Sequence, residues 1–296
     1  MDIQSIQAFI RVAEQASFSR AADLLHVSQP AISKRIAALE ASLDQRLFDR
    51  IGRKVTLTQA GFALLPRARK LLTELEDAKR LLSNLSGEVQ GALTLATSHH
   101  LGLHRLPPIL RQFTQQFPQV KLDIQFLDSE QAYAGVISGA LELAIVTLAP
   151  VPDPSLVVVP VWQDALQFVA SHDHPLKRLQ PLELADLTHH DAILPGPRTF
   201  TREIVEAFFA EQDLELKVSL STNYLETIKI MVSIGLGWSL LPQTLVDDSL
   251  SVLTLRHPDI SRPLGFIYHR ERTLSNAAKQ LIQLLEDARL QAHRQG

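Results

Sequence analysis

The sequence contains no cysteine among its 296 residues. Disulfide bonds, zinc–thiolate sites, thiol redox sensors and cysteine nucleophiles are therefore excluded. Long hydrophobic runs are also missing, because no apolar stretch approaches the roughly 20 residues that a membrane-spanning helix needs. The first fifteen residues carry charges throughout and have no apolar segment of signal-peptide length. We therefore expect a cytoplasmic protein without a membrane partner.

The chain also has little net charge, with a formal value of −3 at pH 7. The charges are unevenly distributed, because residues 1–60 hold eight Lys or Arg and six Asp or Glu, whereas the remainder holds 21 and 26. A mildly basic N-terminal segment on an acidic body hints at nucleic-acid binding at that end. The length is sufficient for two or three domains with substantial cores.

Residues 17–43 show two short amphipathic helices separated by a tight turn. Ser19 is predicted to cap the first helix and Ser28 the second. Gln29 then occupies the first helical position and Pro30 the first turn, where a missing amide proton costs nothing. Two helices joined by so short a turn cross steeply, which predicts a helix-turn-helix.

The second of these helices is predicted to run to about residue 43 with an apolar stripe on one side. The stripe consists of Ile32, Ile36, Leu39 and Leu43. The opposite side is small, polar and cationic near the helix N-terminus, which suits entry into the major groove of DNA. Candidate contacts to bases and phosphates, with Gln29 as base reader, are Ser28, Gln29, Pro30, Ser33, Lys34 and Arg35. A three-helix bundle with a solvated charged face is the alternative.

Residues 47–61 read as a short hairpin with a turn centred on Gly52. Arg50, Arg53 and Lys54 lie in this hairpin. A basic wing beside a recognition helix is placed to contact the phosphate backbone.

The stretch from Ala8 to Gly61, which includes SFSRAADLLHVSQPAISKRIAALEASL and LFDRIGRKVTLTQAG, resembles the LysR-type transcriptional regulators. The resemblance continues more loosely through the whole chain. It implies an α/β protein with an N-terminal winged helix-turn-helix, a long linker helix and two Rossmann-like α/β subdomains of periplasmic-binding-protein type. The expected division is a DNA-binding domain at 1–58, a coiled-coil linker and dimerisation helix at 59–87, and an effector-binding domain at 88–296, with subdomain 1 at about 88–163 and 265–296 and subdomain 2 at about 164–264.

The linker helix is predicted to start at a Thr58 cap and to bend near Pro66. Apolar residues repeat along it at steps of four and three, as in a coiled coil. They are Leu64, Ala68, Leu71, Leu75, Ala78, Leu82 and Leu85. Such a stripe needs a partner, which is either the helix's own domain or a second chain. The resemblance implies a homodimer on a roughly palindromic operator of double-stranded DNA. A homotetramer is a family expectation, and RNA polymerase is a further partner if the regulator is an activator.

After Gly91, strands alternate with helices, which predicts parallel sheets in two α/β subdomains joined by two crossovers. In such sheets a ligand binds beyond the carboxyl ends of the strands, at helix N-termini. Each hydroxyl taken singly favours a helix cap over a ligand contact, but hydroxyls and amides that converge there favour the binding of a small anionic effector. The candidates are Thr97, Ser98, His99, His100, Ser129, Thr147, Thr199, Phe200, Thr201 and Thr222.

Among these candidates, the resemblance supports Thr97, Ser98, Thr147 and the segment 199–201 as effector contacts. The Thr-Ser-His-His start is similar to that of the branch that senses sulfur metabolites. Residues 199–202 depart from the Thr-Gly-Arg pattern of that branch, which leaves the effector unassigned.

The eleven histidines include the adjacent pairs His99–His100 and His189–His190 and the closely spaced His172 and His174. Adjacent histidines on a strand point to opposite faces and chelate poorly, so we expect no metal site and no cofactor. His99 and His100 are instead predicted to donate to the anion with a charge that depends on pH.

Three classes of function compete. The leading interpretation is an effector-responsive DNA-binding regulator. A second is an enzyme or a transport-type binding protein with a fused helical domain, but the sequence has no nucleophile elbow, phosphate loop, metal triad or dinucleotide fingerprint. We therefore do not expect an enzyme. A third is a sensor that responds to a protein in place of a small molecule.

Overall fold

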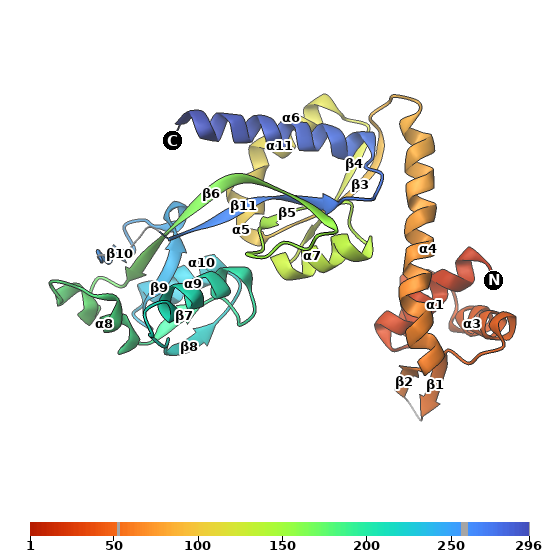
Figure 1. Cartoon of the computed structure of the whole chain (residues 1–296), viewed down its shortest axis with the longest axis horizontal. Coiled ribbons are helices and arrows are strands. Elements are labelled where there is room, and N and C mark those ends of the chain that lie inside the picture. Colours follow the sequence, from red (N-terminus) through yellow and green to blue (C-terminus); the bar gives the residue numbers. More distant parts are fainter. Residues whose placement is uncertain (52–53, 256–259, 296) are drawn as a thin grey trace. The chain divides into compact units, whose positions relative to one another are not determined.

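The computed structural model describes residues 1–51, 54–255 and 260–295, with only the backbone for 50–51 and 292–295. The chain forms two compact units, Met1–Ser86 and Gly87–Gly296. Within the described residues, no helix has both the length and the apolar character required to cross a bilayer. Figure 1 labels the elements of each unit.

The first unit contains four helices and a hairpin among its described residues. They are α1 (Ile3–Gln15), α2 (Phe18–Leu24), α3 (Gln29–Leu43), β1 (Phe48–Ile51), β2 (Lys54–Leu57) and α4 (Gln59–Asn84). Ser28 caps α3 as predicted, with its Oγ accepting from the Ala31 amide at 3.4 Å. The cap of α2 is Ser17 and not Ser19, because Ser17 has the extended backbone of a cap and its Oγ accepts from the Arg20 amide.

The core of the first unit confirms the predicted orientation of α3. Ile32, Ile36 and Leu39 are buried among residues of α1, α2, β1 and α4. Leu43, which the stripe included, is 36% exposed, because α3 ends there and the next residue, Asp44, has a left-handed backbone.

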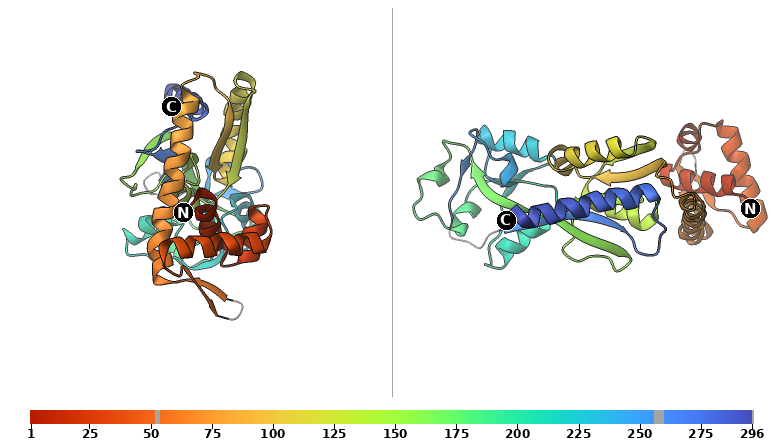
Figure 2. Two further views of the ribbon diagram at one scale, coloured as in Figure 1. Left: turned by 90° about the vertical axis from the view of Figure 1, so that its right-hand side faces the viewer. Right: turned by 90° about the horizontal axis from the view of Figure 1, so that it is seen from above.

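The predicted hairpin forms with antiparallel pairing from Phe48 opposite Leu57 to Ile51 opposite Lys54. Its proposed turn residue Gly52 lies outside the described residues. Figure 2 (left) shows the hairpin extending beyond the helices of its unit. Helix α4 begins where predicted, since the Thr58 Oγ1 accepts from the Gly61 amide at 3.0 Å.

The second unit has a curled, mixed sheet of seven strands in the order β10–β6–β11–β5–β3–β4, with β9 also paired to β6, and a separate parallel pair β7–β8. The strands are β3 (Gly91–Thr97), β4 (Val120–Phe126), β5 (Leu143–Thr147), β6 (Leu156–Ala170), β7 (Ala192–Leu194), β8 (Val218–Ser221), β9 (Ser239–Pro242), β10 (Ser251–Val252) and β11 (Ile260–His269). Among the strands of the described residues, only β3–β4, β3–β5 and β7–β8 pair in parallel, because β6 and β11 run through the sheet as a long antiparallel pair. The expectation of parallel sheets is thus wrong for the centre of this unit, where β11 pairs antiparallel with β5 and β6.

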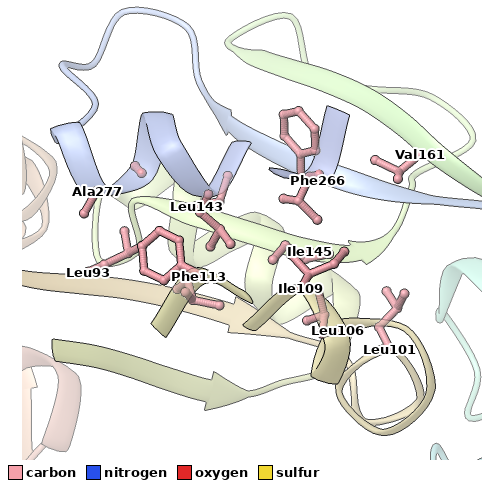
Figure 3. Close-up of a cluster of buried hydrophobic side chains, with 14 of the residues drawn as sticks. Leu93, Leu101, Leu106, Ile109, Phe113, Leu143, Ile145, Val161, Phe266 and Ala277 are labelled. Carbon is pink, nitrogen blue, oxygen red and sulfur yellow. The ribbon is translucent and has the colours of Figure 1, made fainter. Parts of the chain in front are cut away.

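The helices of the second unit cover both faces of its sheets (Figure 1). They are α5 (His99–His104), α6 (Leu106–Gln116), α7 (Ser129–Ser138), α8 (Leu184–Thr188), α9 (Phe200–Ala210), α10 (Leu225–Ser233) and α11 (Asn276–Gln295), with 3₁₀ turns at Pro175–Arg178 and Gln243–Leu245. Figure 2 (right) shows α11 running along the length of the unit. Phe113 of α6 points toward Leu93 and Leu143 of the sheet and fills the core beneath α6 and α11 (Figure 3).

Two lobes share the long strands β6 and β11. Lobe A comprises β3–β5, α5–α7 and α11, whose apolar residues form one core on each face of the sheet. Lobe B comprises α8–α10 and β7–β10, with its own pair of cores. The register of β11 against β6 shifts between Leu264 and Gly265, where a Cβ on Gly265 would lie 2.1 Å from the Val159 carbonyl oxygen. The residue boundaries of the expected domain division remain predictions.

Candidate functional site

The outer side of α3 presents small, polar and cationic side chains. Ser28, Gln29, Pro30 and Lys34 are exposed, and the Gln29 Nε2 donates to the Ser33 Oγ at 3.2 Å. Because Ile32 and Ile36 on the other side are fully buried, this surface is the one that α3 offers to a partner.

The remaining cationic candidates of the first unit differ in their surroundings. The Arg35 Nη2 donates to the Gln4 Oε1 of α1 at 2.9 Å, which holds this half-buried guanidinium against α1. Lys54 on β2 is exposed. For Arg50 only the backbone is described, in β1, and Arg53 lies outside the described residues.

A cavity of about 400 Å³ lies between lobes A and B. Its lining comes from the starts of four helices, from β4, β5 and β11, and from adjoining loop residues. The lining residues are Ser98, His99, His100, Phe126, Leu127, Asp128, Ser129, Glu130, Gln131, Thr147, Pro195, Thr199, Thr201, Asn223, Tyr224, Leu225 and Arg262. Seven of the ten predicted effector contacts are thus brought together, namely Ser98, His99, His100, Ser129, Thr147, Thr199 and Thr201.

Three predicted contacts do not line the cavity. The Thr97 hydroxyl is buried and donates to the Ile145 carbonyl at 2.9 Å, because the last side chain of β3 turns toward the neighbouring strand β5. The Phe200 ring packs against Tyr133, with ring centroids 5.1 Å apart. The Thr222 Oγ1 accepts from a backbone amide two residues later, so Thr222 shapes the turn before α10.

A buried ion pair that the sequence analysis missed joins the two long strands at the cavity. The Arg262 Nε and Nη2 donate to the Asp164 Oδ2 at 2.9 and 2.8 Å, and both side chains are at least 95% buried. The Arg262 Nη1 donates to the Thr201 Oγ1 of α9 at 2.9 Å. The sequence did contain a signal for this pair, because Asp164 and Arg262 each interrupt a largely apolar strand, and a buried charge needs a partner.

Two carboxylates of lobe A form hydrogen bonds across the cavity to lobe B, and neither was predicted. The Asp128 Oδ2 accepts from the Asn223 Nδ2 at 2.7 Å. The Glu130 Oε1 accepts from the Phe200 amide at 2.6 Å, at the start of α9. Burial raises the pKa of Glu130 above its usual value. These contacts link the lobes on the side of the cavity formed by α7.

His100 does not behave as predicted. It is buried, and burial, followed by the nearby charge of Arg262, lowers its pKa from 6.5 to about 3. The ring is therefore neutral near neutral pH, and it cannot supply the pH-dependent positive charge that the sequence suggested. His99 is exposed and packs edge-on against Phe126 and Tyr224.

The helix starts around the cavity carry partial positive charge. Helices α5, α7, α9 and α10 all begin at lining residues, and their caps are Ser98, Asp128, Thr199 and Tyr224. Only Thr199 accepts a hydrogen bond from its own helix with its side chain. Helix dipoles and uncapped amides favour negative charge at these ends.

Comparison with known proteins assigns both units. The model of the LysR substrate binding domain matches residues 86–289, and that of the bacterial regulatory helix-turn-helix protein of the lysR family matches residues 3–62. The chain belongs to the LysR family. This LysR-type protein is thus a DNA-binding transcriptional regulator with an effector-binding domain, and it is not an enzyme.

Similar proteins cover nearly the whole LysR-type chain. A probable RuBisCO transcriptional regulator of Synechocystis sp. is 30% identical in sequence. The alignment covers 92% of this chain and 81% of that protein. The DNA-binding transcriptional dual regulator OxyR of Escherichia coli K12 is 28% identical. That alignment covers 99% of this chain and 97% of OxyR. The crystal structure of full-length CbnR complexed with its target DNA shares the fold, with a TM-score of 0.66, 23% identity and coverage of 97% of this chain and 100% of that one.

Proposed function

We propose that α3 inserts its outer surface into the major groove of a roughly palindromic operator. Gln29 reads base edges, and the remaining predicted contacts bind bases or phosphates. These contacts are Ser28, Pro30, Ser33, Lys34 and Arg35 on α3 and Arg50, Arg53 and Lys54 on the wing. The exposed Gln29 and Lys34 opposite a buried apolar side support this assignment. The crystal structure of full-length CbnR, which shares the fold, was determined in complex with its target DNA.

We further propose that α4 pairs with α4 of a second chain, so that each first unit of the homodimer binds one half-site. Ala68 is buried within its own unit, but Leu71, Leu82 and Leu85 of the same seam are 47%, 68% and 78% exposed. Exposed leucines repeating at coiled-coil spacing are explained by a partner helix. The homotetramer and, for an activator, a contact with RNA polymerase are expectations from the family.

The effector that we propose is a small anion held in the cavity between the lobes. Arg262 is neutralised by Asp164 and His100 is neutral, so the anion binds through helix starts and hydroxyls and not through an unpaired cation. The start of α9 is already contacted by the Glu130 carboxylate, which acts there as an internal anion. A bound effector competes with this contact and changes how closely the lobes are held together.

Salt-dependent DNA binding tests the first part of the proposal. Lys34→Ala is expected to weaken binding of the full chain to all duplexes and to reduce the slope of log affinity against log salt by about 1. Lys121→Ala removes an exposed positive charge from β4 in the second unit and is the matched control. Equal affinities for the parent and the Lys34 variant would exclude this lysine from the interface.

Ligand-induced stabilisation tests the second part. A panel of small carboxylates and inorganic oxyanions, with neutral analogues, is added to the full chain, and thermal unfolding is followed by tryptophan fluorescence. A binder present at 100 times its Kd adds about 2.7 kcal/mol to the unfolding free energy. Stabilisation by one anion that is lost in Ser98→Ala supports the cavity assignment. Stabilisation by neutral analogues alone, or by none of the compounds, contradicts it and favours a protein trigger.

A further inference from the structure

Three side chains capable of binding a metal ion converge beside the cavity. His100 and His104 lie one turn apart on α5 in lobe A, and Glu226 lies in the first turn of α10 in lobe B. The His104 Nε2 and the Glu226 Oε1 are 3.2 Å apart, and one ligand atom from each of the three residues lies within 4.8 Å of the others. The spacing of four residues puts both imidazoles on the same side of the helix.

The polar atoms of this cluster have fewer partners than their burial requires. His100 is 5% exposed, and neither of its ring nitrogens makes a hydrogen bond within the described part of the chain. The Glu226 Oε2 is also buried without a hydrogen-bond partner among these residues. Buried polar atoms almost always have a hydrogen-bond partner, because leaving one without a partner destabilises the fold. A cation that accepts the lone pair of one His100 ring nitrogen and binds the Glu226 carboxylate would satisfy part of this deficit.

We propose that His100, His104 and Glu226 bind one divalent transition-metal ion of the Zn²⁺ type. Two imidazole nitrogens and a carboxylate oxygen form a ligand set that suits zinc and its neighbours, whereas Mg²⁺ and Ca²⁺ prefer oxygen ligands alone. Three protein ligands leave a coordination position open for water or an external anion. His100 itself lines the cavity, so the proposed site adjoins the space assigned to the effector.

The surrounding charges are compatible with a cation. Arg262 and Arg105 are close to His100, but both approach Asp164, whose Oδ atoms lie 2.8 Å from the Arg262 Nη2 and 3.9 Å from the Arg105 Nη2. The Asp164 Oδ2 is also 3.6 Å from the His100 Nε2. Asp164 thus offsets the nearby positive charge, and Glu226 supplies a negative ligand.

An ion at this position would connect α5 of lobe A to α10 of lobe B. It would add a link between the lobes through α5, beside the Asp128 and Glu130 hydrogen bonds made by α7 and its cap. The proposed site uses none of the DNA contacts of α3. The proposals of metal binding and of operator binding can therefore each be confirmed or refuted without the other. We expected no metal site because the sequence analysis weighed only histidines that are adjacent or two residues apart. His100 and His104, which are four residues apart, were not weighed as a pair.

Calorimetry with Zn²⁺ alone tests the proposal on the full chain after removal of metals with EDTA and dialysis. The parent is expected to bind one ion per chain with high affinity, and excess Mg²⁺ should not compete. His104→Ala and Glu226→Gln should each weaken this event at least about tenfold. His99→Ala, which removes an exposed histidine from the same helix, is the matched control and should bind as the parent does.

Co²⁺ titration gives a second readout, because a Co²⁺ ion held at low coordination number by two histidines and a carboxylate absorbs visible light far more strongly than octahedral aqueous Co²⁺. The spectrum should appear in the parent and the His99 variant and disappear in the other two. Tryptophan fluorescence checks that all variants are folded. Absence of a single high-affinity site in the parent, unchanged binding in His104→Ala and Glu226→Gln, or equal weakening in His99→Ala would overturn the proposal.

Discussion

The Asp164–Arg262 pair gives the sharpest quantitative prediction. Asp164→Asn keeps the size of the side chain and removes the negative charge that two nitrogens of Arg262 contact at 2.8–2.9 Å. Arg262 is 4% exposed, so its charge cannot be transferred to water without opening the cavity. Breaking a buried pair in this way costs about 3–5 kcal/mol, because the remaining charge stays desolvated and uncompensated.

The assay uses the positions of the two tryptophans. Trp162 and Trp238 both belong to the second unit, so urea or thermal unfolding followed by tryptophan fluorescence reports on that unit in the full chain. For a unit of this size the expected loss corresponds to a fall in Tm of about 6–20 °C. The measurements are made in EDTA, so that no bound metal contributes.

The double variant Asp164→Leu with Arg262→Met is the control. It replaces both charges by apolar groups of similar volume, and such replacements are often neutral or stabilising by about 1–4 kcal/mol relative to the intact pair. We therefore expect the double variant to be more stable than Asp164→Asn alone. If Asp164→Asn costs less than about 1 kcal/mol, or if the double variant is the less stable of the two, the description of a desolvated and mutually dependent pair is wrong.

Two further predictions concern the linker helix and a buried histidine. Leu82→Glu should dissociate the dimer because it places a charge in the α4 seam, whereas Thr73→Glu, which lies outside the seam, should not. Sedimentation velocity measures the mass of each variant in solution. Equal masses for the two variants would refute pairing through α4. Burial lowers the pKa of His100 from 6.5 to about 3, so between these pH values the unfolded chain binds a proton that the folded chain does not. The unfolding free energy should therefore fall on acidification below pH 6.5. This group contributes up to about 1.4 kcal/mol per pH unit. His100→Asn should flatten that slope between pH 6.5 and 5.5 in EDTA, and an unchanged slope would contradict the assignment.

The features predicted correctly from the sequence are those fixed by neighbouring residues. The caps at Ser28 and Thr58 and the buried side of α3 depend on contacts within a few positions along the chain. Helical periodicity alone determines which side chains share a surface.

The features missed depend on pairing between distant segments. Asp164 and Arg262 are 98 residues apart, and Asp128 and Asn223 are 95 apart, so no local pattern relates them. The first half of β6 pairs with the second half of β11 and supports the sheet of lobe A. Its Pro160 interrupts an otherwise β-forming run.

The cavity residues fall between these two cases. Strand ends and helix starts are local features, and they placed most of the effector candidates correctly at the cavity. The adjacent strand of the sheet determines which of two neighbouring side chains faces the cavity. For this reason Ser98 lines the cavity, whereas Thr97 is bonded to β5.

Selection of bound sequences from a random DNA pool by the full chain tests the central claim most directly. If α3 reads the major groove from both chains of a dimer, the selected DNA should contain two inverted half-sites one helical turn, or a multiple of it, apart. Gln29→Ala should relax the preference at one position of each half-site at a cost of about 1–3 kcal/mol, while binding to unrelated DNA is kept. Selection of no common motif, or of an identical motif with identical preference by Gln29→Ala, would contradict the account.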